Sequence, residues 1–424
     1  MSDWWIEKGF PPFDPGGDGF PRPGQVLKAY RCQTKRDDGK PWTQANLANV
    51  LGITEKAVRD LENRDIGMDS YKRRRFLADL FNIPPILLGI TSLEAVIKQQ
   101  EGQPHPNASQ AIPTSPLQKT SIDIIEYHDA LVAYWEANHT DTAEAAMQNI
   151  LERMNHLSTA LPSVRGWQEA SLVALTCQYH QLAAVIVCDQ AYFDSALDHL
   201  NKAVMLAKHL QDDELRSLAL YRRAGVYFDR WELFLDHRDI VYALRDYSAA
   251  HSLEHAIPAQ LKGAILLEFG NAQAKIAQSQ EEKSQALRHI DEAGTIVRQG
   301  QFDDDGHFLS LSEEWYHNDR GATLIALGRS GEALRELALV KRQAHPDFAR
   351  RYAYNDLLEA QAYMGKGQFP LATTMAEASL IVMKEIHSRV NIARISRIST
   401  QLKESTYRNN PEVARLDFLL QAYP

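Results

Sequence analysis

Charged side chains recur along one face of a short helix that we expect to begin at Glu55. Lys56 and Arg59 share this face with Glu55, whereas Val58 and Leu61 lie on the opposite one. Arginine and lysine can donate hydrogen bonds to O6 and N7 of guanine, and glutamate can accept one from N4 of cytosine. An exposed ion pair between Glu55 and Arg59, four residues apart, is the alternative use of these charges.

A second short helix precedes this one across a tight turn, in the stretch WTQANLANVLGITEKAVRDLEN (42–63). Thr43 is an N-cap candidate, because its hydroxyl can accept a hydrogen bond from a free N–H group at the helix start. Gly52 ends the first helix, where a left-handed residue is wanted, and Ala48 is small where the two helices cross. The spacing predicts a helix-turn-helix, whose second helix enters the DNA major groove.

The pattern T-Q-x-x-L-A-x-x-L-G-I-T-x-x-x-V-x-x-L-E-N resembles the Cro and phage-repressor (XRE) family of DNA-binding domains, over about residues 22–90. The resemblance implies a five-helix DNA-binding domain, which we place at residues 22–97. In similar repressors the positions that match Gln44, Thr54 and Asn63 hold the phosphate backbone of the DNA. An ordinary helical hairpin with a glycine turn is the alternative interpretation of the motif.

A later helix of the same domain is expected to be capped by Ser70. Its apolar side would carry Phe76, Leu77 and Leu80. The basic run 72–75 (KRRR) at its start forms either a solvated face or a contact with DNA phosphates.

Composition indicates a globular protein of two or three domains. The chain has 424 residues, 44% of them apolar, and its cysteines, Cys32, Cys177 and Cys188, stand at no metal-binding spacing. Unpaired cysteines of this kind predict a reducing compartment, which we take to be the cytoplasm. The first residues lack a basic region followed by an apolar run, and no long uninterrupted apolar stretch follows, so we expect no signal peptide and no membrane span.

The net charge of −9 is distributed unevenly along the chain. Residues 22–90 carry 13 Lys and Arg against 8 Asp and Glu, whereas the residues before and after them are acidic on balance. A basic module on an acidic body fits a DNA-binding domain joined to a separate partner-binding domain. Ordinary variation of surface charge is the alternative explanation.

Two segments lack helical or strand periodicity. Residues 1–21 combine aromatic residues with Pro and Gly, which predicts an irregular arm, either disordered or laid against the body by its aromatic side chains. Residues 98–119 are polar and contain four prolines, which predicts a linker. The second domain is therefore placed at residues 120–424.

Small or apolar residues recur seven apart in this second domain, which otherwise reads as continuous helix. The pairs are Ala143/Ile150, Ala196/Ala203, Ala243/Ala250, Ala286/Ala293, Ala333/Val340 and Ala372/Ser379. Small-residue turns precede several of these helices, most clearly in LIALGRSGEAL (324–334) and AYMGKGQFPLA (362–372). The pattern resembles tetratricopeptide repeats, in which paired helices stack into a right-handed superhelix. We therefore predict an all-α protein; an irregular helical domain without a superhelix is the alternative.

A superhelix of this kind presents a concave surface lined by the first helix of each pair. Aligning the second-helix alanines places five amide side chains on that surface: Gln178, Gln181, Asn271, Asn318 and Gln361. An amide offers both a donor and an acceptor, so it can pair with the backbone of an extended peptide. Solvated groove residues are the alternative.

Patterns for catalysis or metal binding are weak. His251 and His255 stand four apart on one expected helix, with His237 upstream, but no third metal ligand is evident. No nucleophile elbow or glycine-rich phosphate loop occurs. We therefore expect no metal, no cofactor and no enzymatic activity.

The order of the two domains resembles that of the quorum-peptide-sensing regulators (the RRNPP family). The resemblance implies a transcription regulator that binds a palindromic double-stranded DNA site, forms a homodimer and responds to a signalling peptide or a protein partner. The rival interpretation is an interaction scaffold, whose repeats bind another protein and whose first domain serves only as a tether.

Limited proteolysis should cleave between Lys98 and Lys119, because a polar linker without packed side chains is open to protease. The cleavage should release a helical fragment that begins near Thr120, as mass spectrometry of the products would show. Resistance of the whole window would mean that the two predicted domains are docked as one body.

Overall fold

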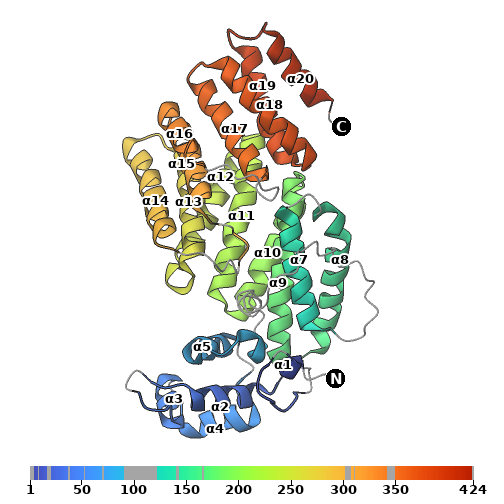
Figure 1. Ribbon diagram of the computed structural model, residues 1–424, viewed down its shortest axis with the longest axis vertical. Coiled ribbons are helices and arrows are strands. Elements are labelled where there is room, and N and C mark those ends of the chain that lie inside the picture. The colour runs from blue at the N-terminus through green and yellow to red at the C-terminus, as the bar shows by residue number, and fades with distance from the viewer. Residues whose placement is uncertain are drawn as a thin grey trace. The chain divides into compact units, whose positions relative to one another are not determined.

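The computed structural model describes residues 4–7, 9–16, 21–36, 39–51, 53–68, 71–89, 122–139, 143–164, 167–300, 307–309, 311–340 and 349–422. These residues form helices and contain no strand beyond two isolated bridges, which confirms the predicted all-α class. The N-terminal elements are α1 (Trp4–Glu7), α2 (Pro23–Gln33), α3 (Gln44–Leu51), α4 (Glu55–Arg64), α5 (Tyr71–Phe81) and the 3₁₀ helix η1 (Pro85–Leu88) (Figure 1).

Most of the remaining α-helices are longer. They are α7 (Ile124–His139), α8 (Ala143–Ala160), α9 (Trp167–Asp189), α10 (Phe193–Leu210), α11 (Asp213–Phe234), α12 (His237–His251), α13 (Ala259–Ile276), α14 (Gln280–Gln299), α15 (Glu313–Ala326), α16 (Ser330–Leu337), α17 (Ala349–Gly365), α18 (Phe369–Glu385), α19 (Arg389–Glu404) and α20 (Pro411–Gln421). Two further 3₁₀ helices are η2 (Leu161–Ser163) and η3 (Glu254–Ala256).

The chain divides into two compact units. The first comprises Met1–Ala133, Asn149–Tyr179 and Met205–Asp212, and the second comprises Tyr134–Gln148, His180–Val204 and Asp213–Pro424. The predicted linker at residues 98–119, the predicted turn residue Gly52 and the predicted cap Ser70 lie outside the described residues.

In the first unit, α2, α3 and α4 pack around an apolar core. Leu27, Leu47 and Val58, one from each helix, are fully buried. Both predicted N-caps are confirmed, because the hydroxyl of Thr43 accepts a hydrogen bond from the backbone N–H of Asn46 and that of Thr54 accepts one from Ala57. The caps fix where α3 and α4 begin.

The start of α2 touches the end of α4 backbone to backbone at Gly24. A Cβ atom at this position would lie 2.2 Å from the carbonyl oxygen of Leu61 and 2.8 Å from that of Glu62. Beside this contact, Asp65 accepts hydrogen bonds from the backbone N–H of Gly24, at 2.8 Å, and from the guanidinium of Arg22, at 2.9 Å. Only glycine allows the two helices to come this close.

The N-terminal arm is more ordered than expected. Trp4–Glu7 form one helical turn, so the prediction of an arm without any helix is wrong. Trp5 and Phe13 are buried, and the backbone N–H of Asp14 donates to the side chain of Gln25 on α2. Apolar burial and this hydrogen bond hold the arm against the first unit, which was one of the two predicted states.

Helix α5 differs from its prediction in two places. Phe76 is 43% exposed, because the buried face of the helix carries Leu77, Ala78 and Phe81 instead. Arg74, in the middle of the basic run, is fully buried and donates a hydrogen bond to the carbonyl oxygen of Leu88. Its guanidinium therefore belongs neither to a solvated face nor to a phosphate contact.

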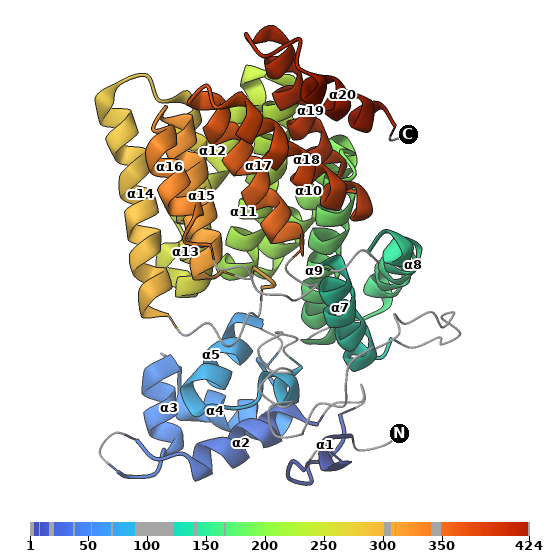
Figure 2. The same ribbon diagram turned by 45° about the horizontal axis from the view of Figure 1, so that its top comes forward.

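The second unit contains an array of helix pairs: α11 with α12, α13 with α14, α15 with α16, α17 with α18 and α19 with α20. Figures 1 and 2 show neighbouring pairs lying side by side in chain order. Nine of the small residues that recur at seven-residue spacing in the sequence are fully buried, on α10, α12, α14, α16 and α18. They are Ala196, Ala203, Ala243, Ala250, Ala286, Ala293, Ala333, Ala372 and Ser379.

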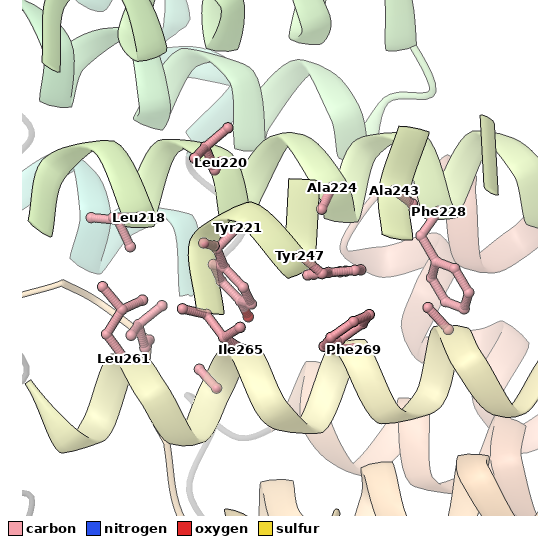
Figure 3. Close-up of a cluster of buried hydrophobic side chains, with 14 of the residues drawn as sticks. Leu218, Leu220, Tyr221, Ala224, Phe228, Ala243, Tyr247, Leu261, Ile265 and Phe269 are labelled. Carbon is pink, nitrogen blue, oxygen red and sulfur yellow. The ribbon is translucent and has the colours of Figure 1, made fainter. Parts of the chain in front are cut away.

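Aromatic and aliphatic side chains fill the space between α11, α12 and α13. Figure 3 shows Tyr221 of α11 and Tyr247 of α12 pointing toward Ile265 and Phe269 of α13. The rings of Tyr221 and Tyr247 lie 6.2 Å apart. Each pair leaves one apolar face open, and the next pair covers it, so burial depends on the neighbours.

The array closes on itself, because α19 contacts α11. The guanidinium of Arg394 on α19 donates to carboxylates of Asp229, at 2.6 Å, and Glu232, at 2.8 Å, on α11. Asp189 at the end of α9 accepts hydrogen bonds from Ser388 at 2.6 Å and from Arg350 of α17 at 2.7 Å. These bonds join segments more than 160 residues apart in the sequence.

Replacing Gly24 by alanine should lower the free energy of unfolding by about 1–3 kcal/mol, because the added methyl group must push two backbones apart. Chemical denaturation monitored by circular dichroism measures the change. Gly331→Ala is the matched control, since its Cβ meets no atom within 4 Å in helix α16. A loss no larger than that of the control would contradict the close approach.

Candidate DNA interface and interior pocket

Helix α4 presents the residues predicted to contact DNA on one solvent-facing side. The exposed residues of this set are Thr54, Glu55, Lys56, Arg59 and Asn63. Val58 and Leu61 anchor the opposite side in the core. Lys56, Arg59 and Asn63 follow one another at spacings of three and four residues, so they share a single face of the helix.

The alternative pairing of Glu55 with Arg59 is not formed. Within the described residues no ion pair joins them, and the guanidinium of Arg59 has no protein partner there. The ion pair that α4 does carry along its own surface joins Arg64 to Asp60 at 3.6 Å. Arg59 is therefore left available to another molecule.

A buried ion pair holds α4 against α2. The guanidinium of Arg31 donates to both carboxylate oxygens of Glu62, at 2.5 and 3.2 Å, and also to the carbonyl oxygen of Trp42. The side-chain amide of Gln44 donates to Glu62 at 2.7 Å. Helices α2, α3 and α4 thus meet at the carboxylate of Glu62, which sets the orientation of α4.

Sequence reasoning missed this network. The signal was present: Glu62 follows Val58 and Leu61 at the spacing of the apolar face, and a carboxylate at such a position needs a partner. The structure also gives Gln44 an internal partner through one of its amide hydrogens. Its predicted contact with phosphate stays a prediction, for which the amide keeps its second hydrogen and its oxygen.

The five amides predicted to line an open groove are placed differently from one another. Gln181, Asn271 and Asn318 are at most 3% exposed, so the prediction that they face an open surface is wrong. Gln181 accepts from Arg222, and Asn318 accepts from Asn355, because helix pairs stack over both amides. The other two, Gln178 and Gln361, are partly buried.

Gln361 lines a cavity of about 410 Å³ with Lys275 and Gln401. A second cavity, of about 370 Å³, lies inside the closed array and is bordered by α9, α11, α13, α17 and α19. Its walls include five aromatic residues and six charged ones. These are Trp135, Tyr221, Tyr247, Phe308 and Trp315, and Asp189, Arg222, Asp229, Glu268, Arg350 and Arg394. We call this second cavity the interior pocket.

The cations of the interior pocket are already paired. Arg394 binds Asp229 and Glu232, and Arg350 binds Asp189. Arg222 lies over the ring of Trp135, 4.4 Å from its centre, and donates to Gln181 and to the carbonyl oxygen of His307. Each guanidinium is thus held in a fixed direction, which a binding site requires.

Two carboxyl groups of this region have no cation beside them. Among the described residues, no cation lies within ion-pair distance of Glu268, and Asp319 accepts a hydrogen bond from Trp315 while its Oδ2 is buried without one. Burial raises the pKa of Glu268 to about 7, and repulsion from Asp229 and Glu232 adds to this rise while Arg394 opposes it. Burial and repulsion from Glu268 likewise raise the pKa of Asp319.

Glu232 shows the opposite behaviour. Burial alone would raise its pKa, but the ammonium of Lys275 and the guanidinium of Arg394 lower it to about 2. Glu232 lines the cavity of about 410 Å³, whereas Glu268, whose carboxyl group exchanges its proton near neutral pH, lines the interior pocket.

No family model matches the chain, and no curated protein matches it. One helical stretch, Glu169–Asp189, is long and apolar enough to cross a membrane, but 83% of its most apolar window is buried inside the protein. Within the described residues no three His, Cys, Asp or Glu side chains are placed to hold a metal ion. A function must therefore be inferred from the side chains described above.

The raised pKa of Glu268 predicts a pH-dependent stability. Between its ordinary value of 4.5 and about 7, the folded protein keeps a proton that the unfolded chain releases, so stability falls as pH rises through this window. Glu268→Gln removes this cost and should be more stable than wild type above pH 7, by on the order of 1–3 kcal/mol.

Thermal and urea unfolding from pH 4 to pH 8 measure this difference, which should shrink toward the acidic end. Glu281→Gln, at an exposed position of α14, controls for the loss of one negative charge. A Glu268→Gln variant that is less stable than wild type at pH 8 would show that the carboxylate has a stabilising partner.

Proposed function

We propose that this protein is a sequence-specific DNA-binding transcription regulator of the XRE helix-turn-helix type. The observation that carries the proposal is the exposed row Lys56, Arg59 and Asn63 on α4. This row begins at a capped helix N-terminus and stands on a helix whose direction is fixed by Arg31 and Glu62. A recognition helix needs this combination of free polar groups and a rigid support.

In this proposal α4 enters the major groove with its first turns toward the bases. Lys56 and Arg59 donate to guanine, and Glu55 accepts from cytosine. Thr54, Gln44 and Asn63 hold phosphates, which set the position of the helix without reading the sequence. The exposed ammonium of Lys28, 3.5 Å from the side chain of Asn63, adds positive charge beside the same helix end.

The helical array serves as the regulatory part, with tetratricopeptide-like pairs. Two observations support this regulatory role. Small residues are buried along the second helices, and side chains of the array line a cavity. A ligand that binds one state of the array more tightly than another shifts the protein toward that state. In a homodimer on a palindromic site, a change in the spacing of the two α4 helices would alter affinity, because half-sites lie roughly 34 Å apart.

Arg59→Ala should lower affinity for the preferred DNA site by about 1–3 kcal/mol and relax the preference at one base position. The site is first obtained by selecting bound fragments from random DNA, and affinities are then measured by fluorescence anisotropy at several salt concentrations. Arg64→Ala is the matched control, since Arg64 is an exposed arginine of the same helix that lies at its far end and is paired with Asp60.

An equal loss on every sequence would make Arg59 a phosphate contact instead of a base contact. Failure of the selection to enrich any site would overturn the regulator and favour an interaction scaffold with a tethering domain.

A further inference from the structure

The interior pocket contains a carboxyl group with no cation paired to it. Its arginines are all engaged by carboxylates, an amide or a carbonyl oxygen. Among the described residues that line the pocket, the carboxyl of Glu268 has no ion-pair partner, and the hydroxyl of Tyr247 and Nε of Arg350 are buried without a hydrogen bond. Glu268 and Tyr247 can each accept a hydrogen bond, and Glu268 can bear negative charge.

Two neighbouring helices bring the two acceptors to the pocket, because Glu268 comes from α13 and Tyr247 from α12. Buried polar atoms are nearly always paired in folded proteins, so an unpaired carboxyl group and an unpaired hydroxyl in one cavity are a sign of a missing donor.

Aromatic side chains make up much of the rest of the pocket lining. Trp135 and Phe308 stack with ring centres 5.1 Å apart and planes inclined by 13°. Tyr221 and Trp315 also line the pocket. Aromatic faces attract both apolar groups and cations.

We propose that the interior pocket binds a compact organic cation, whose ammonium or guanidinium group pairs with the carboxylate of Glu268 and whose apolar body lies against Trp135, Phe308 and Trp315. The cation supplies the donors that Glu268 and Tyr247 lack. This inference rests on the proposed function, because it names the chemical class of the ligand that would act on the helical array.

Charge selects this class over its rivals. An anion would meet arginines that already hold carboxylates, together with the repulsion of Glu268. A neutral ligand would leave a buried carboxyl group unpaired, which costs free energy. Burial favours the protonated form of Glu268 in the free protein, and a bound cation favours the carboxylate instead.

The test uses three probes that share one ring and differ in charge: 2-phenylethylamine, its neutral N-acetyl derivative and phenylacetate. Binding to the full-length protein is measured without DNA, by isothermal titration calorimetry and by ligand-observed NMR. We expect the amine to bind at least about tenfold more tightly than either of the other probes.

Glu268→Gln should abolish this preference, because it keeps the shape of the side chain and removes the charge. Glu281→Gln should retain the preference, since this side chain is exposed on α14 outside the pocket. Equal binding of the amine and its acetyl derivative to wild type, or no binding of the amine up to its solubility limit, would overturn the proposal without reference to any variant. Retained preference in Glu268→Gln would overturn the role of this carboxylate.

The outcome of the amine-binding test can be distinguished from the outcome of the DNA-binding test. Specific DNA binding with no amine binding would overturn this inference alone. Amine binding by a protein that selects no DNA site would support the cation site and overturn the regulator.

Discussion

Arg394 makes the contact on which the second unit depends. Its guanidinium, on α19, donates hydrogen bonds to two carboxylates of α11. One side chain thus joins a late helix of the array to an early one. The side chain is only 13% exposed, and an arginine so far from water must be matched in charge and direction. Leaving one buried partner of such a pair alone costs roughly 3–5 kcal/mol. With Lys275 on the far side of Glu232, the closure also sets the electrostatics of the cavity inside.

The first unit uses the same physical device on a smaller scale. Arg31 and Glu62 bring two positions 31 residues apart into a bidentate pair, and Gln44 adds a third direction of support. In both units a planar guanidinium, through its directed hydrogen bonds, fixes the angle between two helices. Apolar packing alone would not fix this angle. The difference lies in what the fixed helices present. In the first unit they present a row of exposed polar side chains, and in the second they present a pocket lined by aromatic and charged side chains.

The periodicity of the sequence predicted those features that depend on contacts within one helix or between adjacent helices. The caps at Thr43 and Thr54 and the small residues of the second helices follow from contacts within about one turn or one helix crossing. The failures have a common cause. Arg74, Gln181, Asn271 and Asn318 are polar, and their burial depends on which distant element covers them. The carboxyl groups of Glu268 and Asp319, which have no cation beside them among the described residues, could not be found either, because nothing in a helical repeat pattern states that the array closes around them.

The closure of the array also bears on the order of folding. Arg394 and Asp229 are separated by 165 residues, whereas each helix pair is completed within a few dozen. Contacts between distant residues form late, since the loss of chain entropy must be met before they contribute any stability. During synthesis the early pairs can stack while α19 has yet to be made. The interior pocket can therefore form only after the last quarter of the chain has been synthesised. A truncated product lacks the cavity even if its helices fold correctly.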